Sequence, residues 1–281
     1  MLALAFSDLR VMLRGGGDLG SGVAYRLYRA GFAVQILELE RPLLVRPAVS
    51  YGTAIFDGEI SVEGITARHF SNLAEYDKYP LKREYIPVYI DPDGAYLPSS
   101  DVVIDARMAK VNLGTRITDA RLVVALGPGF TAHDDCHAVI ETNRGHNLGR
   151  VYYAGCAEPD TGTPGVVNGR GAERVVRAPE DGYITRQIKV GETVREGQPL
   201  AYMNDATPLL APFDGMLRGL IHSGVFVRKG QKVGDVDPRA EREHCFTISD
   251  KALAIGGGVL EAVLASEDVR ARLAGAEFRL P

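Results

Sequence analysis

The feature that most limits how this chain can fold lies near its start, where Arg14 precedes the stretch GGGDLGSG at residues 15–22. Glycine loses more backbone freedom on folding than any other residue, so five glycines in eight residues need a reason. Residues 10–13 before the stretch predict a short buried strand. Residues 19–30 after it carry apolar side chains at helical spacing, and residues 33–39 predict a second strand. Together they predict a βαβ unit with parallel strands and a right-handed crossover.

Six further apolar runs predict more strands of the same sheet. They lie at residues 65–69, 86–90, 102–105, 122–126, 138–141 and 151–154. Several are continuous β-branched runs, which are typical of strands covered on both faces. The sequence therefore predicts an α/β fold whose first domain, residues 1–172, is a Rossmann-like doubly wound sheet that binds a nucleotide.

An internal repeat predicts a second, all-β domain over residues 173–240. The sequence APEDG at 178–182 matches APFDG at 211–215, and further turn glycines and valines match at the same offset. A repeat of this kind indicates one supersecondary unit used twice. The segment resembles the barrel-sandwich hybrid of lipoyl and biotinyl domains. The connection between its halves, residues 202–208, has no lysine, so we expect no covalent lipoyl or biotinyl group.

The remaining residues, 241–281, predict a helical segment that packs on the first domain. Ser249 is a candidate helix cap, and leucines and valines follow at near-helical spacing. Gly256, Gly257 and Gly258 interrupt this pattern, each at a cost of about 1 kcal/mol relative to alanine. Close packing against the first domain, contact with a ligand, or a break between two helices would each explain them.

Composition narrows the classes of partner and the cellular location. The 281 residues carry a formal net charge of −4, so no broad basic field favours nucleic acid or a membrane surface. Three cysteines without a CxxC pair favour a reducing compartment. The N-terminal apolar run is too short for a membrane span and lacks the basic residues of a signal peptide. We expect a cytoplasmic protein. The sequence is compatible with either a monomer or a homo-oligomer.

The glycine stretch has the spacing of a dinucleotide-binding turn. Gly15 would allow the tight turn, Gly17 the approach of a pyrophosphate, and Gly20 the close packing of helix on strand. Glu38, at the end of the second predicted strand, would accept hydrogen bonds from ribose hydroxyls. A carboxylate there favours NAD or another unphosphorylated ribose over NADP. Asp18 is unfavourable beside a pyrophosphate unless it caps the helix.

The densest polar chemistry lies between residues 127 and 165. Gly127 and Gly129 form a loop after a predicted strand, where ligands bind in parallel sheets. Arg144 and His146, separated by a glycine, suit the binding of a phosphate or carboxylate, although a solvated turn would carry the same residues.

Cys136 and His137 are candidate catalytic residues. As a thiolate–imidazolium pair they could carry sulfur or selenium. They could cooperate only in a loop, because adjacent residues of a strand point to opposite faces. A buried structural cysteine is the alternative. We predict no metal site. His133 and His137 would form a metal-binding pair only on a helix, which the residues before them do not indicate, and the site would need further ligands such as Asp134 or Cys136.

The segments RGGGDLGSGVAYRLYRAGF, MAKVNLGTRITDA, LGPGFTAHDDCHAVIETNRGHNLGRV and DTGTPG form a specific set. In these motifs the chain resembles the YqeB-type proteins of the selenium-dependent molybdenum hydroxylase system, over nearly its whole length. The first domain is also similar to the nucleotide-binding part of xanthine dehydrogenase accessory proteins. The resemblance implies an accessory role in the maturation of molybdenum hydroxylases.

The leading hypothesis is therefore an accessory protein that binds a nucleotide or a molybdopterin-type ligand. Its all-β domain would dock on a molybdenum hydroxylase or on another maturation protein. Two alternatives are enzymes, namely an NAD-dependent oxidoreductase and a Cys136-dependent sulfur or selenium transferase. A third alternative is a non-catalytic assembly scaffold.

Overall fold

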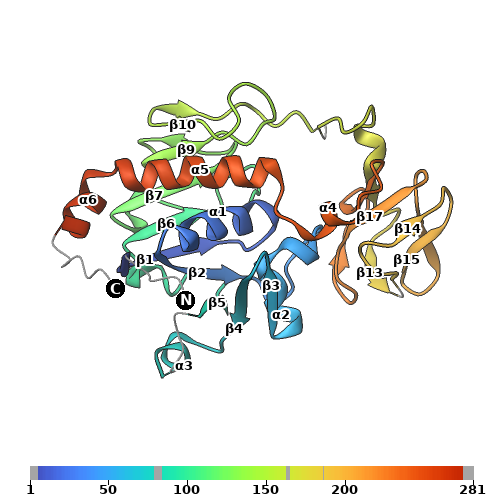
Figure 1. Ribbon diagram of the computed structural model, residues 1–281, viewed down its shortest axis with the longest axis horizontal. Helices are drawn as coiled ribbons and strands as arrows, with labels where there is room; N and C mark the ends of the chain where they lie inside the picture. Colours follow the sequence, from blue (N-terminus) through green and yellow to red (C-terminus); the bar gives the residue numbers. More distant parts are fainter. Residues whose placement is uncertain (1–5, 79–83, 163–164, 186, 275–281) are drawn as a thin grey trace.

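The computed structural model describes residues 6–78, 84–162, 165–185 and 187–274. The N-terminal apolar run and the end of the predicted helical segment lie partly outside the described residues, in the first five and last seven residues of the chain. Figure 1 shows a large α/β body beside a smaller all-β unit, here called the β-module. None of the helices in the described residues has the length and apolarity needed to cross a membrane.

The α/β body is built on one nine-stranded, mostly parallel sheet. Only the two edge strands, β10 and β3, run antiparallel to their neighbours. In spatial order the strands are β10 (Val151–Tyr152), β9 (Ala138–Ile140), β7 (Leu122–Leu126), β6 (Val102–Asp105), β1 (Phe6–Arg14), β2 (Phe32–Glu38), β5 (Tyr85–Ile90), β4 (Ile65–His69) and β3 (Glu59–Val62). A separate two-stranded ribbon joins β8 (Thr131–Ala132) to β11 (Gly155–Cys156).

The predicted βαβ unit is present, with strand β1, helix α1 (Asp18–Arg29) and strand β2 in succession. β1 and β2 pair in parallel, and β6 pairs in parallel on the other side of β1. Helix α1 buries its apolar side, including Val23 and Leu27, against the sheet. The spacing of apolar residues predicts the eight strands named above and this helix to within a few residues of their bounds. It does so because the side chains buried by the sheet recur at the period of each strand or helix.

The α/β class is confirmed, but the prediction of a Rossmann-like doubly wound sheet is wrong. After α1, the crossovers hold only short helices: α2 (Ala54–Asp57) and α3 (Leu73–Lys78) among the described residues. The face opposite α1 is covered largely by loops, whose Phe130 and Ala157 pack with strand residues such as Val123. A buried strand has the same apolar composition whether a helix or a loop covers it, so the sequence pattern did not separate the two.

The β-module consists of two four-stranded antiparallel sheets. One has the order β12 (Val175–Arg177), β19 (Lys232–Asp237), β17 (Gly215–Leu220), β14 (Thr193–Val194), and the other β16 (Thr207–Leu210), β15 (Pro199–Met203), β13 (Gly182–Thr185), β18 (Phe226–Val227). The two copies of the repeat exchange equivalent contacts: Gly197 N donates to Ala211 O at 2.9 Å, and Gly230 N to Ala178 O at 2.8 Å. The two copies therefore interlock around one core, although the assignment to a barrel-sandwich hybrid is not confirmed.

Beyond the β-module, α4 (Glu243–Phe246) leads into α5 (Asp250–Ala265) and α6 (Glu267–Ala274). Helix α5 is continuous through its three glycines and lies beside α1 on the same face of the sheet (Figure 1). A Cβ on Gly256 would lie 2.6 Å from the carbonyl oxygen of Gly22, and one on Gly258 would collide with the carbonyl oxygen of Gly149. A Cβ on Gly257 would meet open space. Close packing therefore explains two of the three glycines.

Candidate functional site

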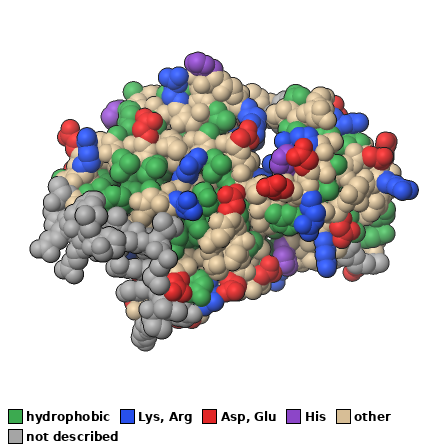
Figure 2. All heavy atoms as spheres, viewed as in Figure 1, with side chains coloured by type: hydrophobic (Ala, Val, Ile, Leu, Met, Phe, Trp, Pro, Cys, Tyr) green, Lys and Arg blue, Asp and Glu red, His purple; other side chains and the backbone are tan. Residues whose placement is uncertain are grey.

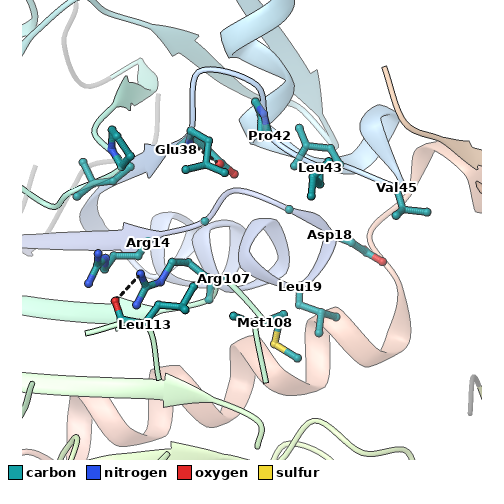
Figure 3. A pocket seen from close by; sticks show the side chains of 18 of the residues that line it. Arg14, Asp18, Leu19, Glu38, Pro42, Leu43, Val45, Arg107, Met108 and Leu113 are labelled. Atoms are coloured by element: carbon teal, nitrogen blue, oxygen red, sulfur yellow. Dashed lines mark hydrogen bonds between the residues drawn. The ribbon is translucent and has the colours of Figure 1, made fainter. Parts of the chain in front are cut away.

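A cavity of about 680 Å³ opens at the carboxyl ends of four neighbouring parallel strands, β6, β1, β2 and β5. We call it the glycine-turn cavity. Its wall is formed by the end of β1 and the turn after it, the start of α1, the end of β2 with the loop at residues 42–46, and the loop at 106–113. Figure 3 shows side chains from these segments facing one space. Ligands of open parallel sheets bind at this edge.

The glycine turn has the geometry that the sequence predicted for its first and third glycines. Gly15 has φ +98°, a conformation that other residues rarely adopt. A Cβ on Gly20 would collide with the carbonyl oxygen of Gly15, so this glycine lets the helix start close to the strand. Gly17 is different, because its backbone is extended and a Cβ there would meet only Leu44 at 3.8 Å. The space beside Gly17 belongs to the cavity.

Glu38 lines the cavity but is already bound to its own backbone. Its Oε1 accepts from Gly16 N at 2.6 Å, and its Oε2 accepts from Leu39 N at 2.9 Å. The side chain is 8% exposed, and burial raises its pKa despite these two hydrogen bonds. Glu38 therefore braces the glycine turn. The predicted contact with ribose hydroxyls stays a prediction, with one lone pair of each oxygen still available.

Two arginines that the sequence analysis did not select stand at one end of the cavity. Arg107 is held by Asp105, with Nε and Nη2 at 3.1 and 2.5 Å from its carboxylate oxygens. Arg14 is 6% exposed and donates to the Thr115 hydroxyl at 3.2 Å. Within the described part of the chain Arg14 has no carboxylate in ion-pair contact. Burial and the neighbouring Arg107 lower the pKa of Arg14. Its position directly before the glycine turn was a signal that could have identified it.

Asp18, the expected disadvantage beside a phosphate, is neutralised. Both of its carboxylate oxygens accept from Nη1 of Arg46, at 2.9 and 3.0 Å. Arg46 is buried, and its Nη2 donates to the carbonyls of His244 and Thr247. Asp18 is the first residue of α1 and makes no cap; Gly17 stands at the N-cap. The pair instead joins the start of α1 to the segment that returns from the β-module.

Apolar side chains form a further part of the cavity wall. Leu39, Leu43 and Leu113 line the cavity and are each about half exposed, at 48%, 47% and 53%. Pro42 and Met108 add further apolar lining (Figure 3). A cavity with a cationic end and an apolar wall suits a ligand that has an anionic group and a flat apolar part.

The other predicted anion-binding residues lie away from this cavity. Arg144 forms a two-point ion pair with Asp250, both distances 2.8 Å, and lines a second cavity described below. His146 is exposed on the following turn. Gly127 and Gly129 leave room for neighbouring backbone and side chains: a Cβ on Gly129 would lie 2.7 Å from the carbonyl of Lys110. These two glycines shape the loop rather than line the glycine-turn cavity.

Cys136 and His137 have separate partners, which does not favour a catalytic pair. Cys136 is fully buried, and this burial is the main reason that the pKa of its thiol rises to about 12. Its Sγ lies 4.0 Å from the carbonyl oxygen of Thr131. His137 Nδ1 accepts from Val123 N at 2.9 Å, and burial lowers its pKa. A protonated thiol beside a neutral imidazole is unsuited to sulfur transfer. Cys156, in contrast, is exposed.

Among the described residues, no group of three or more His, Cys, Asp or Glu side chains is placed to hold a metal ion. On the face of the molecule in Figure 2, basic and acidic side chains are interspersed, without a broad area of one sign.

Comparison with known proteins supports the resemblance drawn from the motifs. No protein-family model matches the chain. The chain is 50% identical, over 256 residues, to "Uncharacterized protein YqeB" of Escherichia coli K12. The chain is similar to YqeB. The match covers 90% of this chain but 47% of the relative, so the chain spans about half the length of that YqeB protein. The YqeB-type resemblance is thus supported, whereas the link to molybdenum hydroxylases is not tested by it.

Solved structures give weaker likenesses. A succinylglutamate desuccinylase/aspartoacylase of Rhodobacter sphaeroides is 31% identical over 24% of this chain and 22% of its own, with a TM-score of 0.21. An aspartoacylase family protein of Mesorhizobium loti is 13% identical over 81% and 84% of the two chains, with a TM-score of 0.25. At these TM-scores neither structure bears on activity or ligand.

Proposed function

We propose that the glycine-turn cavity binds a small molecule that carries a phosphate and a flat heterocycle, either a nucleotide such as NAD or a molybdopterin-type ligand. The observation that supports this most directly is Arg14, a buried cation in the cavity wall without a carboxylate in contact among the described residues. Asp105, Asp119 and Asp91 act on this charge only from a distance, and a phosphate would add direct charge-assisted hydrogen bonds. The N-terminus of α1 adds backbone amides that favour an anion at Gly17.

The apolar wall supplies the second half of the proposed site. A heterocycle placed against Leu39, Leu43 and Pro42 would cover leucine side chains that are now half exposed. Removing apolar surface from water contributes about 25 cal/mol per Å² to binding before the losses of association are counted. The cavity volume, about 680 Å³, falls within the range of small-molecule sites.

We further propose that this ligand handling serves the maturation of selenium-dependent molybdenum hydroxylases, with a hydroxylase or another maturation protein as partner. The support is the set of YqeB-type motifs together with the 50% identity to YqeB. The proposal concerns an accessory protein, and the buried, protonated Cys136 gives a transferase reaction no support. Loss of the gene in its host would then leave the purified hydroxylase deficient in molybdenum cofactor or selenium. Full occupancy of both would remove the maturation role.

Ligand binding is tested by calorimetric titration of the whole chain with NAD, ADP-ribose and AMP, and with a molybdopterin precursor. For any ligand that binds, Arg14→Gln should weaken the affinity by about thirtyfold or more, since loss of a buried charged contact costs at least about 2 kcal/mol. The same variant should be no less stable than the parent protein without ligand, because it removes a buried charge for which burial and the repulsion from Arg107 are the largest effects. Arg10→Gln, in the middle of β1 and outside the cavity lining, is the matched control and should bind normally.

Gly17→Val gives a second, independent test. Its backbone conformation accepts any residue and the new side chain has room to fold, but it would occupy the space in which the phosphate is expected. Binding should be lost while the far-ultraviolet circular dichroism is unchanged. If no compound in the panel binds the parent protein, or if both variants bind as tightly as the parent, the cavity is not the ligand site and a scaffold role is favoured.

A further inference from the structure

A second cavity lies where the β-module meets the α/β body. It has a volume of about 500 Å³ and is lined by residues of both units and of the start of α5. We call it the junction cavity. Asp18, Arg46, Met108 and Lys232 line both this cavity and the glycine-turn cavity, so the two adjoin.

The junction cavity is strongly basic in a protein of net charge −4. Eight basic side chains line it against four acidic ones. Low-dielectric walls strengthen such a local excess, and clefts of one sign concentrate ligands of the other. The excess would therefore attract an anion despite the acidic balance of the whole chain.

Five of the eight basic residues are held by carboxylates. Arg46 and Arg144 form the pairs described above. Arg174 and Arg218 share the buried Asp235, at 2.8 and 3.5 Å, and Lys110 Nζ lies 2.6 Å from Asp160. These side chains are fixed in place and partly neutralised. They form a rigid wall and leave little charge for a ligand.

The remaining three, Lys232, Lys251 and Arg177, have no carboxylate of their own within the described residues. Lys232 Nζ is 3.9 Å from Asp235, whose oxygens already accept from Arg174 at 2.8 and 3.1 Å. The exposed Arg177 donates to a backbone carbonyl on the far side of a turn. Lys251 follows the first residue of α5.

Among the described lining residues, Lys232 and Lys251 are the two ammonium groups that donate a hydrogen bond to no carboxylate, and they come from different units of the fold. Burial is the main reason that both have lowered pKa values, and the charge of Lys232 contributes to lowering the pKa of Lys251. Both side chains line the same cavity, Lys232 from β19 and Lys251 from the start of α5. An anion bound by both would offset their positive charge and hold β19 against α5.

We propose that the junction cavity is a second anion subsite, which takes a phosphate or pyrophosphate group between Lys232 of the β-module and Lys251 of α5. As Lys232 also lines the glycine-turn cavity, the group belongs to the same ligand as the phosphate at Arg14. This assignment to one ligand rests on the proposed function; the subsite itself does not. The ligand class is then a small molecule with at least two separated anionic groups, and the β-module forms half of its binding site.

The subsite is tested with inorganic pyrophosphate, titrated calorimetrically into the whole chain at low ionic strength. The double variant Lys232→Gln/Lys251→Gln should lower the affinity at least tenfold. Lys189→Gln/Lys229→Gln makes the same change of charge at two exposed lysines of the β-module outside the cavity, and should stay within about twofold of the parent. Equal pyrophosphate affinities of the two double variants, or no binding by the parent, would overturn the subsite.

A comparison of AMP with ATP tests whether one ligand spans both cavities. ATP should bind the parent at least tenfold more tightly than AMP, and this advantage should disappear in Lys232→Gln/Lys251→Gln. Arg14→Gln should weaken both nucleotides. Loss of AMP binding in Arg14→Gln with unchanged pyrophosphate binding in the lysine variant retains the proposed function and overturns the subsite. Pyrophosphate binding that depends on the two lysines, without any binding of AMP, retains the subsite and overturns the proposed function.

Discussion

The three consecutive glycines of α5 offer a sharp test of the fold, because the same substitution should have opposite effects at neighbouring positions. Replacing glycine by alanine inside a helix stabilises it by about 1 kcal/mol at each position. The new methyl group would meet nothing at Gly257. At Gly256 it would lie 2.6 Å from the backbone oxygen of Gly22, and at Gly258 it would collide with the backbone oxygen of Gly149.

The magnitudes follow from these contacts. Overpacking of a tight interface costs about 1–3 kcal/mol, and a backbone carbonyl cannot move aside as a side chain can. Gly257→Ala should therefore raise the free energy of unfolding by about 1 kcal/mol. The free energy of unfolding of Gly256→Ala should be about 1–3 kcal/mol below that of Gly257→Ala. Gly258→Ala, whose new methyl group has the closer contact, should be the least stable of the three. The difference between variants isolates the steric effect, since all three gain the same helix propensity.

Urea unfolding followed by circular dichroism measures these differences. The slope m should be equal in the three variants, so that the midpoints report stability alone. Equal stabilisation by all three alanines would contradict the reasoning, because it would mean that α5 does not pack on α1 and on the turn at Gly149 through its glycines. That result would contradict the packing of a continuous helix α5 against α1, and therefore also the position of Lys251 at the start of α5.

Two further predictions concern titration and thiol chemistry. Burial opposes the ionisation of Asp237, but hydrogen bonds from Arg239 lower its pKa to about 2. The carboxylate therefore stabilises the fold above its unfolded pKa near 4, and this contribution is lost as the pH falls through 2. We expect about 2 kcal/mol less stability across that window, measured by urea unfolding; an equally steep loss in Asp237→Asn would refute the assignment. Iodoacetamide at neutral pH should label the exposed Cys156 at least tenfold faster than the buried Cys136. Mass spectrometry of the peptides measures this, and first labelling at Cys136 would restore it as a reactive thiol.

The elements that the sequence predicts correctly are those that a pattern of a few residues determines. The strands β6 and β7 match their predicted bounds, and α1 begins one residue before its prediction. Each buries side chains whose spacing follows from the geometry of one strand or helix. The short strand β3 (Glu59–Val62) was missed, because only one of its residues is buried and its alternation is therefore weak.

The parts that failed depend on contacts between segments far apart in the chain. The glycines of α5 look like a helix break until Gly22 and Gly149 lie against them. Glu38 had the right residue type at the end of β2, but its hydrogen bond to Gly16 N depends on how the turn folds back. A negative charge at Asp18 looked unfavourable because Arg46, its partner, lies in a different loop. None of these pairs leaves a periodic signal.

The proposed ligand sites depend on positive charges that no carboxylate contacts closely among the described residues. Arg46 lines both cavities, but its Nη1 and Nη2 are already bound by Asp18 and by two backbone carbonyls, so it has little charge left for a ligand. Arg14 on one side, and Lys232 with Lys251 on the other, retain the capacity to bind an anion. Because these groups come from β1, β19 and α5, they meet only when the chain returns from the β-module to the sheet. A molecule with a single phosphate would satisfy one side and leave the other unbalanced, whereas a ligand with two anionic groups would satisfy both and hold the two units together.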